Sequence, residues 1–207
     1  MLDGDSTQTS RRRLLEAGKS LFARLGYEQA STAAIAREAG TSESQLVRYY
    51  RSKAGLLETI FNESWGMLNG RIQQVVVAAT SAGEAMQSIV QTLIEAFNSD
   101  LDLAFLLLFE GRRVRGGTTE IFFSQGFVDF ENLLRVLVQR GKKDGTIAPD
   151  LPEDAVVFAL LGAVENMARE RLLAARTNQE PSLSEDDLRA VFTALLNGLR
   201  NGNGRPS

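Results

Sequence analysis

The sequence predicts an all-α protein of about nine helices, in which an N-terminal three-helix helix-turn-helix domain precedes a larger helical domain. Apolar residues recur at helical spacing along most of the chain, and no segment alternates apolar and polar residues as a half-buried strand does. Two short helical patterns meet at Gly40, and a much longer pattern follows them. We therefore expect the first domain at residues 9–53 and the second at residues 54–200.

The first helix is expected to begin at Thr9 or Ser10 and to end at Gly26, after a polar N-terminal segment that we expect to be disordered. Three arginines at residues 11–13 follow this predicted start, which is the end of a helix that disfavours cations. The arginine run is either a solvated charge cluster or an arm that contacts the backbone or minor groove of DNA.

Residues 31–53 are expected to form two short helices around a tight turn, followed by the start of a third helix. Gly40 stands where a helix commonly ends on a residue in the left-handed conformation. Ser42 and Gln45 have the spacing of a capping box at the start of the second helix. Ser52 is the expected cap of the third helix. Two helices of small residues joined by a short turn with glycine predict a helix-turn-helix motif.

The second helix of this motif has one apolar anchor, Leu46, and an otherwise polar surface. Glutamine can pair bidentately with adenine, and arginine with guanine, in the major groove of DNA. The same surface would also suit an ordinary helical hairpin whose polar face is only solvated.

The distribution of charge favours nucleic acid, although the whole chain has a net charge of −3. Up to Gly55 there are nine Lys or Arg against six Asp or Glu, and the remainder has fourteen against twenty. This asymmetry is expected if only the N-terminal part contacts phosphate. The residues that we assign to DNA contact are Arg11, Arg12, Ser31, Thr41, Ser42, Glu43, Ser44, Gln45, Arg48, Tyr49 and Lys53.

Six further helices are expected in the larger domain, because capping residues, glycines and prolines divide its apolar periodicity. The third of them is apolar almost all round, which predicts that it is buried. Their expected ranges are residues 54–79, 83–98, 101–113 with Asp100 as cap, 118–141 opened by Thr118 or Thr119, 153–175, and 184–199 opened by Ser184.

The last two long helices have broad apolar faces that could form a homodimer. Helix-turn-helix dimers read two half-sites of a palindrome, so a two-fold partner has a physical role. The same faces could also pack into the core of the single chain, and both can hold. The residues that we assign to the interface are Val156, Leu160, Met167, Phe192, Leu195 and Leu199.

Aromatic residues in the larger domain are either core residues or the lining of an apolar pocket for a small-molecule effector. A pocket of this kind needs a few polar groups to orient its ligand, and Asn166 lies within an otherwise apolar helix. The candidate lining residues are Trp65, Phe105, Phe109, Phe123, Phe127 and Asn166.

The composition removes several functional classes. The chain has no cysteine and no histidine, which excludes thiol chemistry and imidazole metal ligands. No phosphate-binding loop, dinucleotide fingerprint or metal-ligand cluster is present, so we expect neither an enzyme nor a cofactor. The N-terminus lacks the pattern of a secretory signal, and the apolar runs are too short to span a membrane, so we expect a cytoplasmic protein.

The N-terminal part of the chain resembles the DNA-binding domain of the TetR family of one-component regulators, without a gap from helix one to Leu57. Five positions depart from the family pattern, among them Arg51, where proline is frequent, and Gly55, where an acidic residue is common. Thr32 and Thr41 stand where valine is usual, and Val47 replaces a tyrosine that commonly contacts the DNA backbone. The matching positions are Leu14, Leu15, Ala17, Leu21, Phe22, Gly26, Tyr27, Ile35, Ala36, Ala39, Gly40, Ser42, Leu46, Tyr49, Tyr50, Ser52, Lys53, Leu56 and Leu57.

The resemblance implies a sequence-specific regulator of transcription, expected to be a repressor that a small apolar effector releases from a palindromic operator in double-stranded DNA. Two alternatives stay open at this point. The chain could be a helical protein-interaction scaffold, or a constitutive repressor without a ligand. Binding of duplex DNA that weakens steeply with salt separates a regulator from a scaffold.

Overall fold

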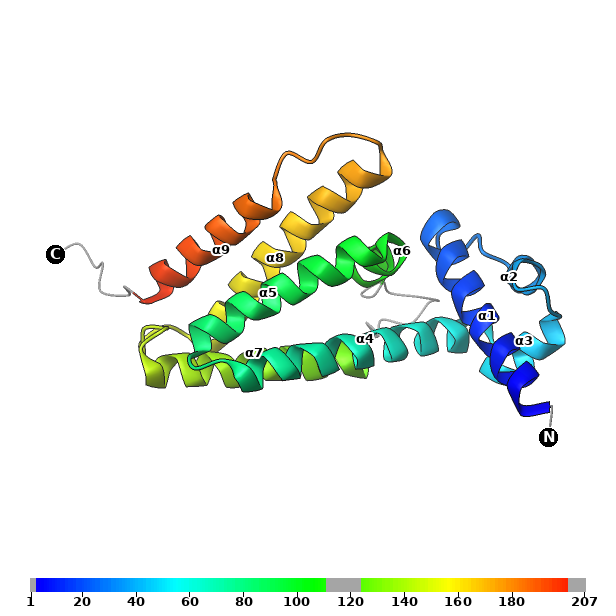
Figure 1. Cartoon of the computed structure of the whole chain (residues 1–207), viewed down its shortest axis with the longest axis horizontal. Helices are drawn as coiled ribbons and strands as arrows, with labels where there is room; N and C mark the ends of the chain where they lie inside the picture. Colours follow the sequence, from blue (N-terminus) through cyan, green and yellow to red (C-terminus); the bar gives the residue numbers. More distant parts are fainter. Residues whose placement is uncertain (1–2, 111–123, 201–207) are drawn as a thin grey trace. The chain divides into compact units, whose positions relative to one another are not determined.

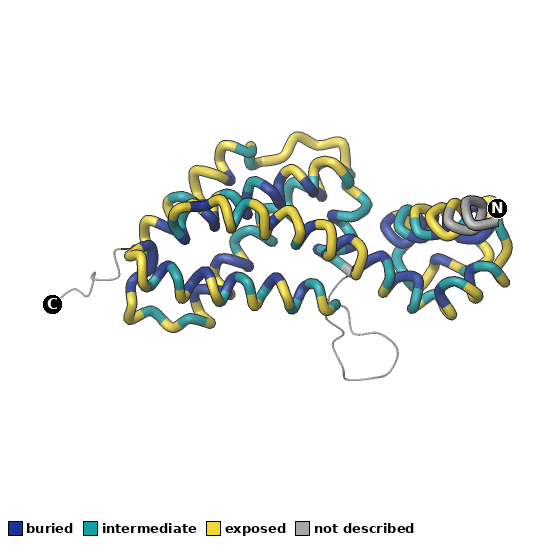
Figure 2. Tube along the Cα trace, turned by 60° about the horizontal axis from the view of Figure 1, so that its bottom comes forward, coloured by how far each residue is buried: buried dark blue, intermediate teal, exposed yellow. Residues whose placement is uncertain are grey.

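The computed structural model describes residues 3–110 and 124–200, and every regular element in them is helical, which confirms the predicted fold class (Figure 1). Along each helix buried and exposed residues alternate at helical spacing, as expected for amphipathic helices packed on one side (Figure 2). The elements are α1 (Asp3–Leu25), α2 (Thr32–Glu38), α3 (Glu43–Tyr50), α4 (Lys53–Ala78), α5 (Ala82–Ser99), α6 (Leu101–Phe105), the π-helix η1 (Leu106–Glu110), α7 (Gln125–Asp144), α8 (Glu153–Arg176) and α9 (Glu185–Arg200).

The chain divides by packing into two compact units. Unit 1 consists of Met1–Gly66 and Asp100–Gln125, and unit 2 consists of Met67–Ser99 and Gly126–Ser207. Helix α4 contributes residues to both units. The units have other bounds than the domains predicted from the motif, because the start of α4 and the whole of α6 pack with the helix-turn-helix segment.

Unit 1 is organised around a core that α1 shares with α2, α3, α4 and η1. Phe22, Ile35, Leu46, Leu56 and Leu106 are all fully buried in it. Leu106 comes from η1, so a segment distant in sequence completes the core of the helix-turn-helix segment. Full burial of an aliphatic or aromatic side chain stabilises a fold by about 1.5–3 kcal/mol, which makes this core the main support of α3.

Unit 2 is a helical layer in which α5 packs against α8 and α9. Asn69 in the second half of α4 donates from Nδ2 to the carbonyl oxygen of Gly126 at 2.8 Å, which joins this part of α4 to the start of α7. The carboxylate of Asp144 accepts from the amide of Ala82 at 2.7 Å and so joins the end of α7 to the start of α5. Burial alone would raise the pKa of Asp144, but hydrogen bonds from Ala82 and Thr146 hold it below its usual value.

Three elements differ from the sequence-based expectation. Helix α1 begins at Asp3 rather than at Thr9, so it extends into a segment that was expected to be disordered. The expected helix 101–113 is five residues of α-helix followed by a π-helix. The predicted start of the next helix at Thr118 or Thr119 lies outside the described residues, and α7 begins at Gln125. None of the described helices is both long enough and apolar enough to cross a membrane.

Two glycines of α4 provide a matched test of the packing around the helix-turn-helix segment. A Cβ at Gly55 would collide with the carbonyl oxygen of Tyr50, whereas a Cβ at Gly66 would meet no atom within 4 Å. We expect Gly66→Ala to stabilise the protein by about 0.5–1 kcal/mol, because alanine favours a helix. We expect Gly55→Ala to destabilise it by more than about 1 kcal/mol, because the turn between α3 and α4 must shift. Urea unfolding followed by circular dichroism measures both, and equal effects of the two substitutions would contradict the close approach at Gly55.

Candidate nucleic-acid interface

The local sequence builds the helix-turn-helix segment from two serine caps and one glycine. Ser31 Oγ accepts from the amide of Ala34 at 3.1 Å at the start of α2, and Ser42 Oγ accepts from the amide of Gln45 at 3.3 Å at the start of α3. Gly40 has a φ of 62°, which confirms the left-handed exit from α2. The turn is therefore fixed by interactions that lie within a few residues of one another.

The capping box predicted at Ser42 is only half formed. The forward bond from the Gln45 amide is present, but the side chain of Gln45 turns elsewhere, because its Oε1 accepts from the hydroxyl of Thr41. Threonine at position 41 has a hydroxyl donor that valine would lack, and this hydroxyl bonds the side-chain carbonyl oxygen of Gln45. The sequence pattern therefore predicted Ser42 as the cap correctly, but it did not predict that Thr41 would bond the side chain of Gln45.

Helix α3 is held on its inner side by Leu46, which is fully buried, and by Tyr50, which is 4% exposed. The hydroxyl of Tyr50 donates to the carbonyl oxygen of Arg11 at 2.7 Å, which ties the end of α3 to α1. Burial raises the pKa of Tyr50 above its ordinary value, so the hydroxyl stays protonated and keeps this bond. These contacts orient the opposite side of α3 toward solvent.

The outer side of α3 is polar except at one position. Glu43, Ser44 and Arg48 are exposed, and Gln45 and Tyr49 are half-buried. Val47 is 52% exposed and offers DNA no hydrogen bond. Among the described residues Arg48 has no ion-pair partner, so its guanidinium is available to a base or a phosphate.

Other side chains assigned to DNA contact already have partners within unit 1. Thr32 Oγ1 donates to Glu43 Oε2 at 2.6 Å, which joins α2 to α3. The hydroxyls of Ser42 and Ser44 lie 2.8 Å apart. These bonds arrange the polar groups of α3 before any ligand arrives.

The three arginines lie well inside α1 and not at its start, which corrects the sequence-based expectation. Arg11 Nη2 lies 3.6 Å from Glu63 Oε1, and its guanidinium lies 5.9 Å from the centre of the Tyr50 ring. Arg13 donates to Ser10 Oγ at 3.3 Å. Arg12 is exposed and has no ion-pair partner among the residues that the structure describes, so it is the freest of the three.

Lys53 has a structural role that its motif did not reveal. Its Nζ donates to the carbonyl oxygen of Tyr27 at 2.9 Å and lies 4.4 Å from the centre of the Tyr27 ring. A weaker bond of 3.4 Å reaches the carbonyl oxygen of Glu28. The ammonium group therefore fixes the loop between α1 and α2 to the start of α4.

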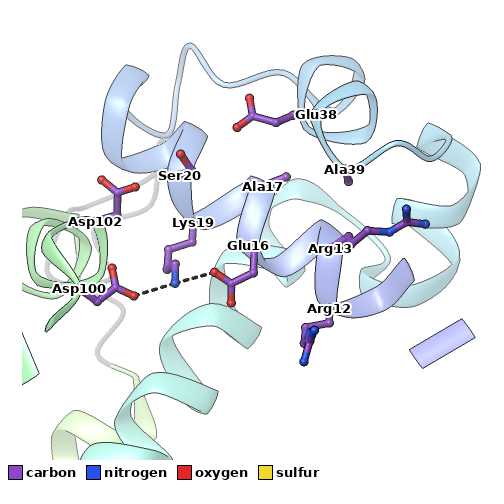
Figure 3. A pocket seen from close by; sticks show the side chains of 10 residues that line it. All are labelled: Arg12, Arg13, Glu16, Ala17, Lys19, Ser20, Glu38, Ala39, Asp100 and Asp102. Atoms are coloured by element: carbon purple, nitrogen blue, oxygen red, sulfur yellow. Dashed lines mark hydrogen bonds and ion pairs between the residues drawn. The ribbon is translucent and has the colours of Figure 1, made fainter. Parts of the chain in front are cut away.

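A groove of about 560 Å³ lies beside α1 in the same unit, and its lining mixes cations with carboxylates (Figure 3). Lys19 Nζ lies between Glu16 and Asp100, 2.7 Å from a carboxylate oxygen of each. Burial alone would lower the pKa of Lys19, but the hydrogen bonds and charges of Asp100 and Glu16 raise it above its ordinary value. The other oxygen of Asp100 caps α6 through the amide of Leu103 at 2.9 Å, so this ion pair ties α6 to α1.

The candidate effector residues fall into both units. Trp65, Phe105 and Phe109 belong to unit 1, where the rings of Phe105 and Phe109 stack at 4.9 Å. Phe127 is buried in unit 2, and Asn166 is exposed there. Phe123 lies outside the described residues.

The candidate dimer residues differ in exposure, and only some of them are accessible to a partner. Val156, Leu160 and Phe192 are buried within unit 2 of the single chain. Leu195 is 40% exposed, and Met167 and Leu199 are half-buried. The residues assigned to the interface did not include Phe158, Leu173 and Val191, which are 57%, 48% and 45% exposed.

Known proteins share both the motif and the fold. Residues 14–60 match the family described as bacterial regulatory proteins, tetR family. The HTH-type transcriptional repressor KstR2 of Mycolicibacterium smegmatis is 26% identical over 155 residues, which are 74% of this chain and 76% of that protein. The crystal structure of the transcriptional regulator FadR from Bacillus subtilis in complex with stearoyl-CoA has a TM-score of 0.74 at 19% identity, covering 92% of this chain and 98% of that one. The crystal structure of AibR in complex with isovaleryl coenzyme A and operator DNA has a TM-score of 0.70 at 18% identity, covering 90% of this chain and 97% of that one.

A capped helix-turn-helix with a buried inner anchor and an exposed polar face is a DNA-binding unit, and the chain is a DNA-binding regulator of transcription. Its N-terminal part is similar to the tetR family of bacterial regulatory proteins, which matches residues 14–60.

Substitutions at Arg48 and Lys53 should separate base reading from support of the fold. If the exposed guanidinium of Arg48 reads a base, Arg48→Ala should weaken the binding free energy for the preferred duplex by about 1–3 kcal/mol and for other duplexes by less. Lys53→Ala should weaken binding to all duplexes alike and lower the unfolding free energy by about 1 kcal/mol, because two carbonyl bonds are lost. Fluorescence anisotropy with preferred and scrambled duplexes, beside urea unfolding, measures both. An Arg48→Ala variant that weakens all duplexes equally would contradict base reading by this residue.

Proposed function

We propose that the protein is a homodimeric repressor that binds a palindromic operator and is released from it by a small, largely apolar effector. The exposed polar face of α3, fixed from behind by Leu46 and Tyr50, is the observation that carries this proposal. The relative named as a transcriptional repressor supports the direction of regulation. Because the protein would act on chromosomal DNA, we propose that it is cytoplasmic, and no catalytic activity is part of the proposal.

The two-fold partner is proposed to cover exposed apolar residues of α8 and α9. Two recognition helices must reach half-sites about 34–36 Å apart, or a multiple of that distance, and a symmetric dimer supplies this spacing. Leu195 keeps its assignment to the interface, and we add Phe158, Leu173 and Val191 because a single chain leaves them exposed. Val156, Leu160 and Phe192 are proposed to support this surface from beneath.

A charge introduced into the proposed dimer surface should produce a monomer. Leu195→Glu places a carboxylate where the partner's apolar side chains would exclude water, whereas Val77→Glu changes a residue of α4 that is 86% exposed. We expect sedimentation velocity at micromolar concentration to show a dimer for the wild type and for Val77→Glu, and a monomer for Leu195→Glu. A wild-type monomer, or a dimer that survives Leu195→Glu, would contradict the proposed interface.

The effector is proposed to be an acyl-coenzyme A thioester or a similar molecule with an apolar chain. The structures named for complexes with stearoyl-CoA and isovaleryl coenzyme A share this fold, which supports the ligand class. Within unit 2 we propose that the buried aromatic residues Phe127 and Phe130 contact the acyl chain of the ligand. Trp65, Phe105 and Phe109 stay candidates in unit 1, and the exposed Asn166 suits a contact at the surface of α8.

The energy required of such an effector is modest. Shifting two states of the dimer from 99:1 to 1:99 needs about 5.5 kcal/mol of preference for the released state. Two equivalent sites would each supply about half of this. Burial of roughly 100 Å² of additional apolar surface per site, equivalent to three or four methylene groups, is sufficient.

Release from DNA should therefore depend on acyl chain length. We expect stearoyl-CoA to dissociate the complex with the selected duplex at lower concentration than isovaleryl-CoA, because each buried methylene adds about 0.8 kcal/mol. Free coenzyme A is the matched control and should leave the complex intact. Fluorescence anisotropy gives the competition curves, and thermal unfolding of the free protein gives an independent measure of binding. If stearoyl-CoA, isovaleryl-CoA and free coenzyme A all leave both the DNA complex and the unfolding temperature unchanged, ligands of this class do not regulate the repressor.

A further inference from the structure

Two threonine hydroxyls of the helix-turn-helix segment are bonded to polar residues of α3. Thr32, the first residue of α2, donates to Glu43 Oε2 at 2.6 Å. Thr41, in the turn between α2 and α3, donates to Gln45 Oε1. Glu43 and Gln45 both belong to the first turn of α3, the part of a recognition helix that contacts base edges.

The bond from Thr41 fixes the orientation of the Gln45 side-chain amide and so determines which of its groups can meet a base. Bidentate pairing of glutamine with adenine uses the amide oxygen as acceptor and the amide nitrogen as donor. Here the hydroxyl of Thr41 bonds one of the two lone pairs of that oxygen and so holds the oxygen toward the turn, and among the described residues the Nε2 group has no hydrogen-bond partner. Gln45 is therefore prepared to donate to an acceptor in the major groove. Guanine offers two, O6 and N7, and thymine offers O4, whereas adenine offers only N7 beside its N6 amino donor, which the held amide oxygen does not reach.

The bond from Thr32 has the complementary effect on Glu43. It occupies Oε2 and leaves Oε1 of an exposed carboxylate to accept. Cytosine N4 is the base group that a glutamate reads in the major groove, and adenine N6 is the other amino donor there. The hydroxyl also restricts the rotation of a long, exposed side chain, which would otherwise lose conformational entropy on binding DNA.

We propose that Thr32 and Thr41 are positioning residues that set the base preference of α3, by presenting Glu43 as an acceptor for cytosine and Gln45 as a donor to guanine or thymine. Neither threonine needs to contact DNA for this role. The inference rests on α3 being the helix that reads bases, as in the proposed function.

The experiment compares the wild type with four variants: Thr41→Val, Thr41→Ser, Thr32→Val and Thr32→Ser. Valine keeps the shape of threonine without the hydroxyl, and serine keeps the hydroxyl. Each protein selects duplexes from a random pool, and the affinity for single-base variants of the wild-type site is then measured. Thermal unfolding of every variant is recorded in parallel.

We expect Thr41→Val to gain adenine at one position of the half-site, with a relative change of roughly tenfold, because the amide oxygen becomes free for a bidentate pair. Thr32→Val should lose discrimination for cytosine at a different position by a similar factor, because the Glu43 carboxylate is no longer held. Both serine variants should keep the wild-type preference. The unfolding temperature should stay unchanged in all four.

Three results would overturn the inference. Valine variants that select the wild-type site unchanged would show that the hydroxyls do not set base preference. Variants that weaken every duplex equally, with a lower unfolding temperature, would show that the hydroxyls only support the fold. A wild-type protein that selects no site from the pool would remove the proposed function, and the inference would fail with it.

Discussion

The burial of Leu46 is the constraint on which the DNA-binding surface depends. Helix α3 has only eight residues, so one fully buried side chain on its inner face fixes the rotation of the whole helix. The core that receives Leu46 is contributed by α1, α2 and α4, and by Leu106 of η1. An alanine at position 46 would leave a cavity and a loosely held helix, so the polar groups on the other face would lose their common geometry.

Polar contacts also hold the helices of unit 1 together. Tyr50 ties the end of α3 to α1, and Lys53 ties the start of α4 to the loop after α1. The ion pair of Lys19 with Asp100 holds α6 against α1. Because these groups are partly shielded from solvent, salt screens them less than it screens exposed pairs. Arg12 and Arg48, by contrast, are exposed cations, and we propose that they contact DNA although the net charge of the chain is negative.

The sequence predicted those features of the fold that depend on near neighbours. Ser42, Ser52, Asp100 and Ser184 cap the helices that they were expected to cap, because a capping bond spans only two or three residues. It could not predict that Asp100 also pairs with Lys19, since the two lie 81 residues apart. The assignment of Lys53 to phosphate contact came from its motif, and only the fold reveals the carbonyl groups of the loop that it binds. The sequence also could not predict that Phe158 and Val191 are exposed, because that depends on which face of α8 and α9 the neighbouring helices cover.

We propose that the outer face of α3 reads bases in the major groove of two symmetric half-sites. Dimethyl sulfate protection on a selected duplex tests it directly, because this reagent methylates guanine at N7 in the major groove and adenine at N3 in the minor groove. The bound protein should protect guanine N7 in both half-sites, whose centres lie about 34–36 Å apart or a multiple of that distance. Protection confined to adenine N3, or to a single half-site, would contradict it.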